Sequence, residues 1–299
     1  MPAKQKTVII VAGPTAAGKT DIAIRVAKQF GTEIISADSR QCYIELNIGV
    51  ARPSQDQLAL VPHHFIASHS IHEKVNAASY EKYALQKVNE IFSRSDIAVM
   101  VGGTGLYIKS FCEGLDYIPE ILPGLKENIL NEYKQKGLQW LQSEVQKQDG
   151  DYYAAGEIQN PHRMIRALEV ILSTGKSILS FQNKMGAKRE FKIIKIGIEL
   201  PKEQLHENIN TRVEQMIEKG LVAEVQSLWE YKGLPALNTV GYKELFLHLE
   251  GKIGLGDAIA EMKKHTRQYA KRQLTWFKKD KEYQWLPPDA MLPGAGNPD

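Results

Sequence analysis

The sequence predicts an α/β fold, with a P-loop NTPase-like core built on a parallel sheet and an all-helical insertion domain. Three observations support this prediction. A glycine-rich phosphate-binding motif follows an apolar run near the start of the chain, strand and helix patterns alternate over the first third, and only helical patterns occupy residues 119–188. Alternation of strands and helices is typical of parallel sheets whose faces are covered by helices.

The first element is an apolar strand at residues 8–12, and a helical pattern follows at residues 21–30. Between them, every fixed position of G-x-x-x-x-G-K-[ST] is filled in the context that the motif requires. Backbone N–H groups and the helix start bind phosphate, lysine adds positive charge and the threonine hydroxyl can bind Mg²⁺. We therefore predict a polyphosphate site formed by Gly13, Pro14, Thr15, Ala16, Ala17, Gly18, Lys19 and Thr20.

Further strand patterns cover residues 33–36, 65–68 and 97–101, with helical patterns at 76–93 and 106–112. Because ligands bind beyond the carboxyl ends of parallel strands, the P-loop, Asp38 and Thr104 should converge on one rim of the sheet. The strand at 97–101 leads into Gly102-Gly103-Thr104-Gly105 with no acid at its tip. Nucleotide-cleaving P-loop proteins usually carry an Mg²⁺-binding Asp there, so the sequence disfavours an ordinary ATPase.

The character of the chain changes near residue 118. Helical patterns broken at Gly137, Gly150, Pro161 and Gly175 fill the middle, and a strand pattern returns at residues 191–200. Helices then dominate, at residues 202–219, 221–231, 240–249 and 257–279. We therefore divide the chain into a first part of the core at 1–118, a helical insertion at 119–189, and a second part of the core at 190–299.

Composition gives broad limits. The chain has 299 residues, with 38 basic and 35 acidic side chains and a formal net charge of +3, which permits a local basic face without demanding one. Two cysteines are too few for a disulfide framework or a zinc site, and no apolar run approaches the length of a membrane helix. We expect a reduced, cytoplasmic monomer with no membrane contact and no obligate protein partner.

Asp38 and Thr104 are the candidate catalytic residues. Asp38 opens the segment Asp38-Ser39-Arg40-Gln41 just past a strand, where it could cap a helix, act as a general base or bind Mg²⁺. Thr104 brings a hydroxyl to the same rim, although it could equally be the N-cap of the following helix.

Two basic segments suggest nucleic-acid binding. Arg163 and Arg166 lie near the start of a helix, where the dipole has no need of positive charge, although pairing with Glu169 is an alternative. Residues 263–279 interleave basic, aromatic and amide side chains, a pattern that suits phosphate contacts and stacking. A solvated face is the alternative there.

Taken together, these segments resemble the bacterial tRNA dimethylallyltransferases, also called tRNA isopentenyltransferases. The matching stretches run in the family's order over nearly the whole chain. They are residues 13–20, 36–43, 47–53, 62–64, 101–107, 161–170, 240–243 and 271–277.

The resemblance implies transfer of a dimethylallyl group from dimethylallyl diphosphate to the exocyclic amine of the adenine 3′-adjacent to the anticodon, with release of diphosphate and with Mg²⁺ as cofactor. It implies that Asp38 takes the amine proton, that Thr104 lies at the reacting ester oxygen and that Arg212 binds diphosphate. It also implies contacts with the tRNA anticodon stem-loop from Asp38, Ser39, Arg40, Gln41, His162, Arg163, Met164, Ile165, Arg166, Gly241, Tyr242, Lys243, Arg267, Lys271, Arg272 and Lys278.

The chain departs from the family pattern at a few positions. Val50 and Arg52 replace an expected Thr and Lys, and Lys126 stands where the family often has a catalytically relevant arginine. Lysine keeps the charge but loses the bidentate fork of arginine. Two other classes share parts of the pattern, namely a P-loop kinase of a small metabolite and a nucleic-acid-binding NTP-dependent switch.

Overall fold

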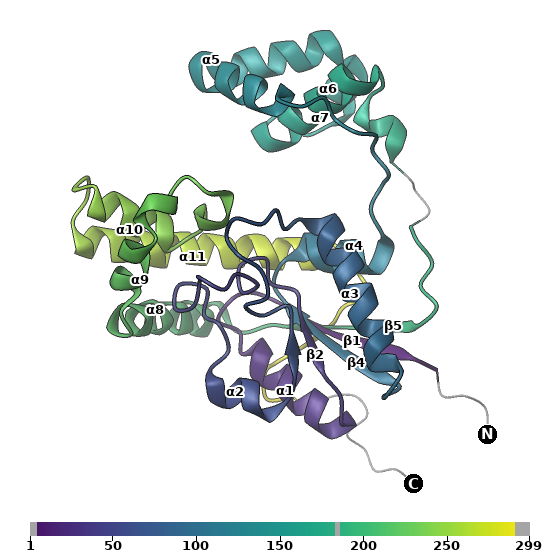
Figure 1. Ribbon diagram of the computed structural model, residues 1–299, viewed down its shortest axis with the longest axis vertical. Helices are drawn as coiled ribbons and strands as arrows, with labels where there is room; N and C mark the ends of the chain where they lie inside the picture. Colours follow the sequence, from purple (N-terminus) through teal and green to yellow (C-terminus); the bar gives the residue numbers. More distant parts are fainter. Residues whose placement is uncertain (1–4, 183–185, 291–299) are drawn as a thin grey trace. The chain divides into compact units, whose positions relative to one another are not determined.

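The computed structural model describes residues 5–182 and 186–290 and divides the chain into two compact units. The core unit comprises Met1–Glu113 and Lys188–Asp299, and the helical unit comprises Gly114–Ala187 (Figure 1). An α/β core interrupted by an all-helical unit is the predicted fold class, which the structure confirms. The sequence-based limits of the insertion were 119 and 189.

A six-stranded sheet forms the centre of the core unit, and all its neighbouring strands are parallel. Its order is β3-β2-β4-β1-β5-β6, so that β1 lies inside the sheet between β4 and β5. Ala12 at the end of β1 pairs with Gly102 on one side and Gly197 on the other. The strands are β1 Thr7–Ala12, β2 Ile34–Ser36, β3 His63–His64, β4 Ile97–Gly102, β5 Lys192–Ile198 and β6 Gln284–Leu286.

Helices cover both faces of this sheet (Figure 1). Alternate residues of β1 explain why: Ile9 and Val11 pack with α1, whereas Val8 and Ile10 belong to the cluster that includes α3, α4 and α11. No helix among the described residues is long and apolar enough to cross a membrane. The core helices are α1 Lys19–Phe30, α2 Gln55–Leu60, α3 Ala77–Phe92, α4 Gly105–Glu113, α8 Lys202–Glu218, α9 Leu221–Ser227, α10 Tyr242–Leu249 and α11 Leu255–Phe277.

The helical unit has its own apolar core, in which Leu141, Met164 and Leu168 are buried. Its helices are α5 Leu125–Gln148, α6 Gly150–Ala155 and α7 Pro161–Thr174. α5 is kinked at Gly137, whose φ of 78° is open to glycine at little cost. The breaks expected at Gly150, Pro161 and Gly175 coincide with the starts of α6 and α7 and the C-cap of α7.

Arg189 links the two segments of the core unit that lie next to the insertion in the sequence. Its Nε donates to the carbonyl of Phe111 at 2.7 Å, and its Nη2 donates to the carbonyl of Ser110 at 3.0 Å and pairs with Glu81 at 2.7 Å. The chain therefore returns from the helical unit to the end of α4, close to where it departed.

Some local predictions were wrong. Residues 65–68 are not a strand, because Phe65 and Ala67 have φ values of 62° and 44°, and the edge strand is β3, just before them. The helix expected at 221–231 ends at Ser227 and is followed by a separate 3₁₀ turn, Trp229–Tyr231. The short elements α2 and β6 were not predicted.

Two fully buried tyrosines lead to a matched prediction. The hydroxyl of Tyr80 has no hydrogen-bond partner among the described residues, whereas that of Tyr242 donates to Glu224 at 2.6 Å. We expect Tyr80→Phe to leave the free energy of unfolding unchanged or to raise it, because an unsatisfied buried polar group is removed. Tyr242→Phe should lower it by about 1.5–3 kcal/mol, because the hydrogen bond from the buried tyrosine to the half-buried carboxylate of Glu224 is lost. Urea unfolding of both variants tests this, and a larger loss for Tyr80→Phe would contradict it.

Candidate active site

The P-loop leaves the centre of the sheet with a backbone that few residues could adopt. Gly13 has a φ of 149°, and a Cβ atom there would lie 2.7 Å from the carbonyl oxygen of Ile198. The ammonium of Lys19 donates to the carbonyl of Pro14 at 2.6 Å. Burial and the nearby Arg212 lower the pKa of Lys19 to about 7, against the opposing pull of Asp38. An anion in this loop would therefore favour the charged lysine.

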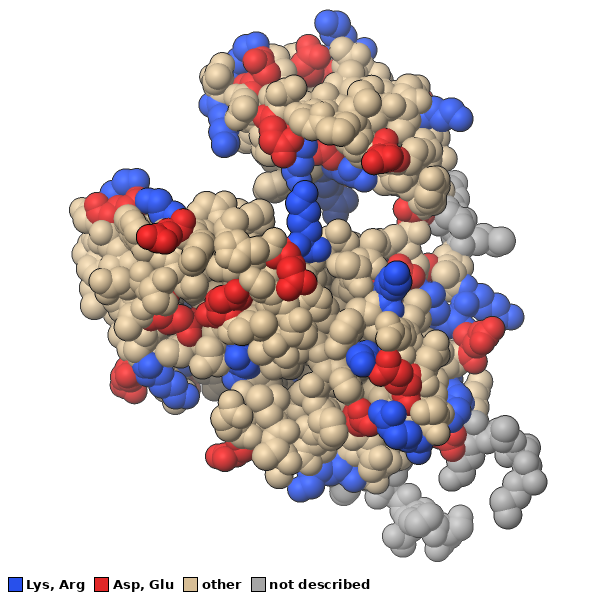
Figure 2. Space-filling model, viewed as in Figure 1, with Lys and Arg blue, Asp and Glu red and all other residues tan. Residues whose placement is uncertain are grey.

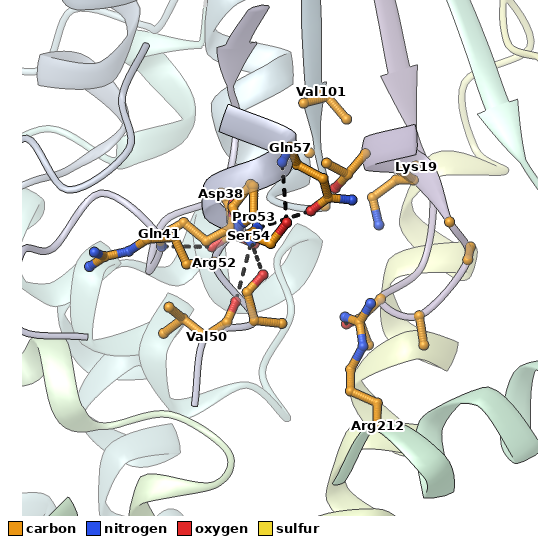
Figure 3. A pocket seen from close by; sticks show the side chains of 18 of the residues that line it. Lys19, Asp38, Gln41, Val50, Arg52, Pro53, Ser54, Gln57, Val101 and Arg212 are labelled. Atoms are coloured by element: carbon orange, nitrogen blue, oxygen red, sulfur yellow. Dashed lines mark hydrogen bonds between the residues drawn. The ribbon is translucent and has the colours of Figure 1, made fainter. Parts of the chain in front are cut away.

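Arg212, on α8, supplies the second cation. Its Nη1 donates to Thr15 Oγ1 at 3.2 Å, which fixes the guanidinium beside the loop. Burial lowers the pKa of Arg212, while Asp38 and Asp21 raise it. Figure 3 shows the side chains of Lys19 and Arg212 on one side of the pocket, facing Asp38 and the segment at 50–57 on the other.

Asp38 follows β2 and is held by its own segment. Its Oδ1 accepts from the backbone N–H groups of Arg40 at 2.8 Å and Gln41 at 3.2 Å. No hydrogen bond to Oδ2 occurs within the described residues, so this oxygen remains available. Among the described residues no helix directly follows Asp38, so these bonds hold a turn and the predicted alternative of a helix cap is wrong.

Thr104 is tied to the same segment from the tip of β4. Its Oγ1 accepts from the Ser39 amide at 3.0 Å and lies 3.3 Å from Ser39 Oγ, and its own amide donates to the carbonyl of Ala37 at 3.1 Å. Thr104 therefore orients the loop that carries Asp38. The predicted convergence of the P-loop, Asp38 and Thr104 on one rim is found in the structure.

Two cavities of the core unit meet at this rim. The first, of about 460 Å³, is lined by the P-loop, Lys19 and the segment at 50–55. The second, of about 720 Å³, extends from Ser39 toward α10 and α11. Residues that line both cavities mark the junction between them. These are Thr15, Asp38, Val50, Ala51, Arg212, Met216 and Tyr269.

Gln41 and Arg52 shape the wall of the first cavity. Gln41 Nε2 donates to the carbonyls of Val50 at 3.2 Å and Ala51 at 3.0 Å. Arg52 donates to three backbone carbonyls, those of Tyr43, Ile44 and Leu46. Both side chains thus hold the loop that forms this wall.

Several residues predicted to contact RNA line the second cavity, namely Ser39, Arg40, Gly241, Lys243 and Arg272. Tyr242 does not, because its side chain is fully buried against Glu224. Its predicted RNA contact is corrected to a structural role.

The basic residues of α11 differ in their surroundings. Arg267 donates to Asn210 at 2.9 Å, and Lys278 pairs with Glu199 at 2.5 Å. Lys271 and Arg272 are exposed and form no ion pair with any described residue, although Arg272 lies 5.8 Å from the ring centroid of Tyr269. Figure 2 shows acidic and basic side chains interspersed on the visible face of the molecule. The cations Lys271 and Arg272, which pair with no described acid, thus belong to α11 and are not part of a broad basic patch on that face.

The remaining predicted residues lie in the helical unit. Arg163 pairs with Glu157 at 3.2 Å and Arg166 with Glu169 at 2.9 Å, so both charges have structural partners. The pair with Glu169 is the alternative that the sequence analysis had left open. Met164 and Ile165 are buried in the apolar core of this unit, which corrects their predicted side-chain contact with RNA. His162, at the start of α7, and Lys126, in the first turn of α5, are exposed.

The sequence argument did not single out Tyr269 and Gln273 of α11. Tyr269 is 37% exposed and lines both cavities, and desolvation of its hydroxyl and the carboxylate of Asp38 raise its pKa to about 12. Gln273 is buried and contacts the P-loop. Their spacing, with Trp276 one turn further on, places them toward one side of the helix and is the pattern that could have indicated them.

The family model described as IPP transferase matches residues 41–280. A curated tRNA dimethylallyltransferase of Christiangramia forsetii is 48% identical over 93% of this chain and 92% of its own length, and one of Bacteroides thetaiotaomicron is 42% identical over 95% and 92%. The solved tRNA isopentenylpyrophosphate transferase of Bacillus halodurans matches with a TM-score of 0.69 and 32% identity, over 95% of this chain and 90% of that one. A eukaryotic dimethylallyltransferase solved acting on tRNA matches with a TM-score of 0.76 at 26% identity, over 95% and 74%. The chain therefore belongs to the IPP transferase family.

Proposed function

We propose that this protein transfers a dimethylallyl group from dimethylallyl diphosphate to the exocyclic amine of the adenine 3′-adjacent to the anticodon in tRNA. The observation that carries the proposal is the pair of cavities that meet at Asp38 and Thr15. The first, which we call the donor cavity, offers phosphate-binding groups. The second, which we call the acceptor cavity, offers exposed cations beside an aromatic ring. Such a site accepts a diphosphate donor and a nucleic-acid acceptor together.

In this reaction the amine nitrogen bonds to the allylic carbon as the bond from that carbon to the diphosphate oxygen breaks. Negative charge then develops on the departing diphosphate. Lys19, Arg212 and the amides of the P-loop lie on the donor side, where they stabilise that charge. A kinase would need a Walker-type acid, but β4 ends in Gly102.

Asp38 is the proposed base. Its Oδ1 is occupied by two backbone amides, which leaves Oδ2 to accept the hydrogen bond and then the proton of the adenine amine. Thr104 fixes the segment that carries Asp38 and is the proposed contact for the reacting ester oxygen. The adenine leaves its stack to reach this junction.

Mg²⁺ is the proposed cofactor, and the residues present fit it. No group of three potential His, Cys, Asp or Glu ligands occurs among the described residues. Mg²⁺ at phosphate sites usually has few protein ligands and takes the rest from substrate phosphates and water. Thr20, in the first turn of α1, would hold it, and the ion would supply positive charge to the diphosphate.

The RNA is proposed to contact the second cavity and the exposed cations of α11. Ser39, Arg40, Lys243 and Arg272 line that cavity, and Lys271 lies beside Arg272 on the helix. Phosphate contacts of this kind set register and affinity. His162, Arg163 and Arg166 of the helical unit are proposed as a further contact with the anticodon stem-loop, and Lys126 is proposed as a further catalytic residue.

Asp38→Asn separates the chemistry of Asp38 from its structural role, because asparagine can still accept from the amides of Arg40 and Gln41. We expect it to slow the chemical step about a hundredfold or more while the affinity for tRNA changes little. Thr104→Ala should also slow this step, with Thr104→Ser as its conservative control. Single-turnover rates measured beside tRNA affinities decide the matter. A loss confined to tRNA binding would contradict the catalytic roles.

The lowered pKa of Lys19 predicts that binding of dimethylallyl diphosphate takes up a proton. At pH 8 a lysine with a pKa near 7 is mostly neutral, and a bound diphosphate raises that pKa, so binding should take up nearly one proton. At pH 6 the lysine is already charged and the uptake should be small. Calorimetry of dimethylallyl diphosphate binding in buffers of different ionisation enthalpy measures this difference.

Two lysine variants complete this test. Lys19→Ala should abolish the pH-dependent uptake and cripple turnover, as should Thr20→Ala for turnover. Lys28→Ala, at the exposed far end of the same helix, should behave like the wild type. An uptake at pH 8 that survives in Lys19→Ala would assign the proton to another group.

Salt dependence tests the RNA surface. Replacing both Lys271 and Arg272 by Ala should reduce the slope of log affinity against log salt by about two for an anticodon stem-loop, because two fewer phosphate contacts release counterions. Lys263→Ala with Lys264→Ala is the control on the same helix, since neither lysine lines either cavity and both pair with acidic residues, Glu214 and Glu261. Arg163→Ala with Arg166→Ala tests the helical unit. Unchanged slopes for both test pairs would place the RNA elsewhere.

A further inference from the structure

Gln273 forms two hydrogen bonds that connect α11 with the two loops at the carboxyl ends of β1 and β4. Its Oε1 accepts from the amide of Thr15 at 2.8 Å, and its Nε2 donates to the carbonyl of Gly103 at 2.9 Å. The side chain is buried, with 7% of the residue exposed. These contacts span 258 and 170 positions of the sequence.

The two partners fix the orientation of the amide. The Thr15 N–H can only donate and the Gly103 carbonyl can only accept, so the oxygen of Gln273 must face Thr15 and its nitrogen must face Gly103. The fit is also tight, because a Cβ atom at Gly103 would lie 2.1 Å from Gln273 Nε2. With the Thr15 amide engaged, the phosphate-binding amides are those further along the loop.

The contacts continue from Gln273 into both cavities. Thr15 lines the donor cavity and receives the guanidinium of Arg212 on its hydroxyl. Tyr269 and Arg272, on the same helix as Gln273, line the acceptor cavity. A displacement of α11 by bound RNA would therefore act on Thr15 and Arg212 through the buried amide of Gln273, alongside the apolar cluster that contains Ala270 and Ala16.

We propose that Gln273 is a positioning residue that couples the two cavities, so that bound RNA strengthens binding of the diphosphate donor and bound donor strengthens binding of RNA. The proposal rests on the function proposed above. Such a coupling is reciprocal for binding free energies. Gln273 borders the first cavity beside Thr15, and its proposed role is to act through Thr15 and Arg212, with no contact to either substrate assigned to it.

Gln273→Glu gives a readout that a purely structural role would not move. While the introduced carboxyl group is protonated it keeps both contacts, since its carbonyl oxygen accepts from Thr15 and its hydroxyl donates to Gly103. Ionisation turns the second contact into a repulsion between two oxygens, and burial raises the pKa of this carboxyl. The KM for dimethylallyl diphosphate, expressed as the ratio of variant to wild type, should therefore rise as the pH is raised from about 5.5 to about 8.5.

Gln273→Met removes both hydrogen bonds at every pH. We measure the Kd for dimethylallyl diphosphate with and without a saturating anticodon stem-loop whose target adenine is replaced by purine, which lacks the reacting amine. The wild type should show at least about fivefold tightening by the RNA, a typical size for coupled sites. Gln273→Met should show none, whereas Thr275→Met, at an exposed position of the same helix, should keep the wild-type factor.

The outcomes separate this inference from the proposed function. Wild-type protein that modifies tRNA but shows no tightening of donor binding by RNA would overturn the coupling and leave the enzyme intact. Full coupling in Gln273→Met would do the same, as would a Gln273→Glu variant as defective as Gln273→Met at all pH values. Recovery of Gln273→Glu on lowering the pH of one sample supports the proposal and excludes misfolding. Failure of the wild type to modify any tRNA would instead reject the proposed function.

Discussion

The position of β1 between β4 and β5 is the constraint on which the site depends. The hydrogen-bonded register sets Ala12, Gly102 and Gly197 level with one another, so β1 and β4 end at one line and β5 ends one residue beyond it. The P-loop, the turn that carries Thr104 and the chain toward α8 all leave from that line. A shift of one residue along β1 would move each of its side chains to the opposite face, against the wrong packing partners, and would separate these groups.

The second constraint is the close approach of backbone segments above that line. Cβ atoms at Gly102, Gly103 and Gly105 would lie 2.2 Å, 2.1 Å and 2.2 Å from Ala37 O, Gln273 Nε2 and Trp276 respectively. The glycines of this turn therefore allow the Asp38 segment and α11 to pack against it. In the same turn, the amide of Thr104 donates to the carbonyl of Ala37.

What could be predicted from the sequence was local. The P-loop, the strand at 97–101 and the long helices follow from apolar period and from motifs that lie within a few residues. The errors have physical reasons. The elements α2 and β3 are too short to show an apolar period. Phe65 packs among aromatic rings in a bend of the chain, and its apolar side chain therefore resembled that of a buried strand residue. The contacts of Gln273 and the partners of Arg163 required the fold, since nothing in the neighbouring sequence indicates them.

The contacts of Arg189 have a consequence for how this chain is assembled. By binding the carbonyls of Ser110 and Phe111, Arg189 closes the core across the insertion point without any help from the inserted residues. The helical unit then behaves as a long loop with fixed ends, and the entropy of closing such a loop grows only slowly with its length. A unit attached in this way is modular. It can lengthen, shorten or diverge through evolution while the contacts that fold the core stay the same.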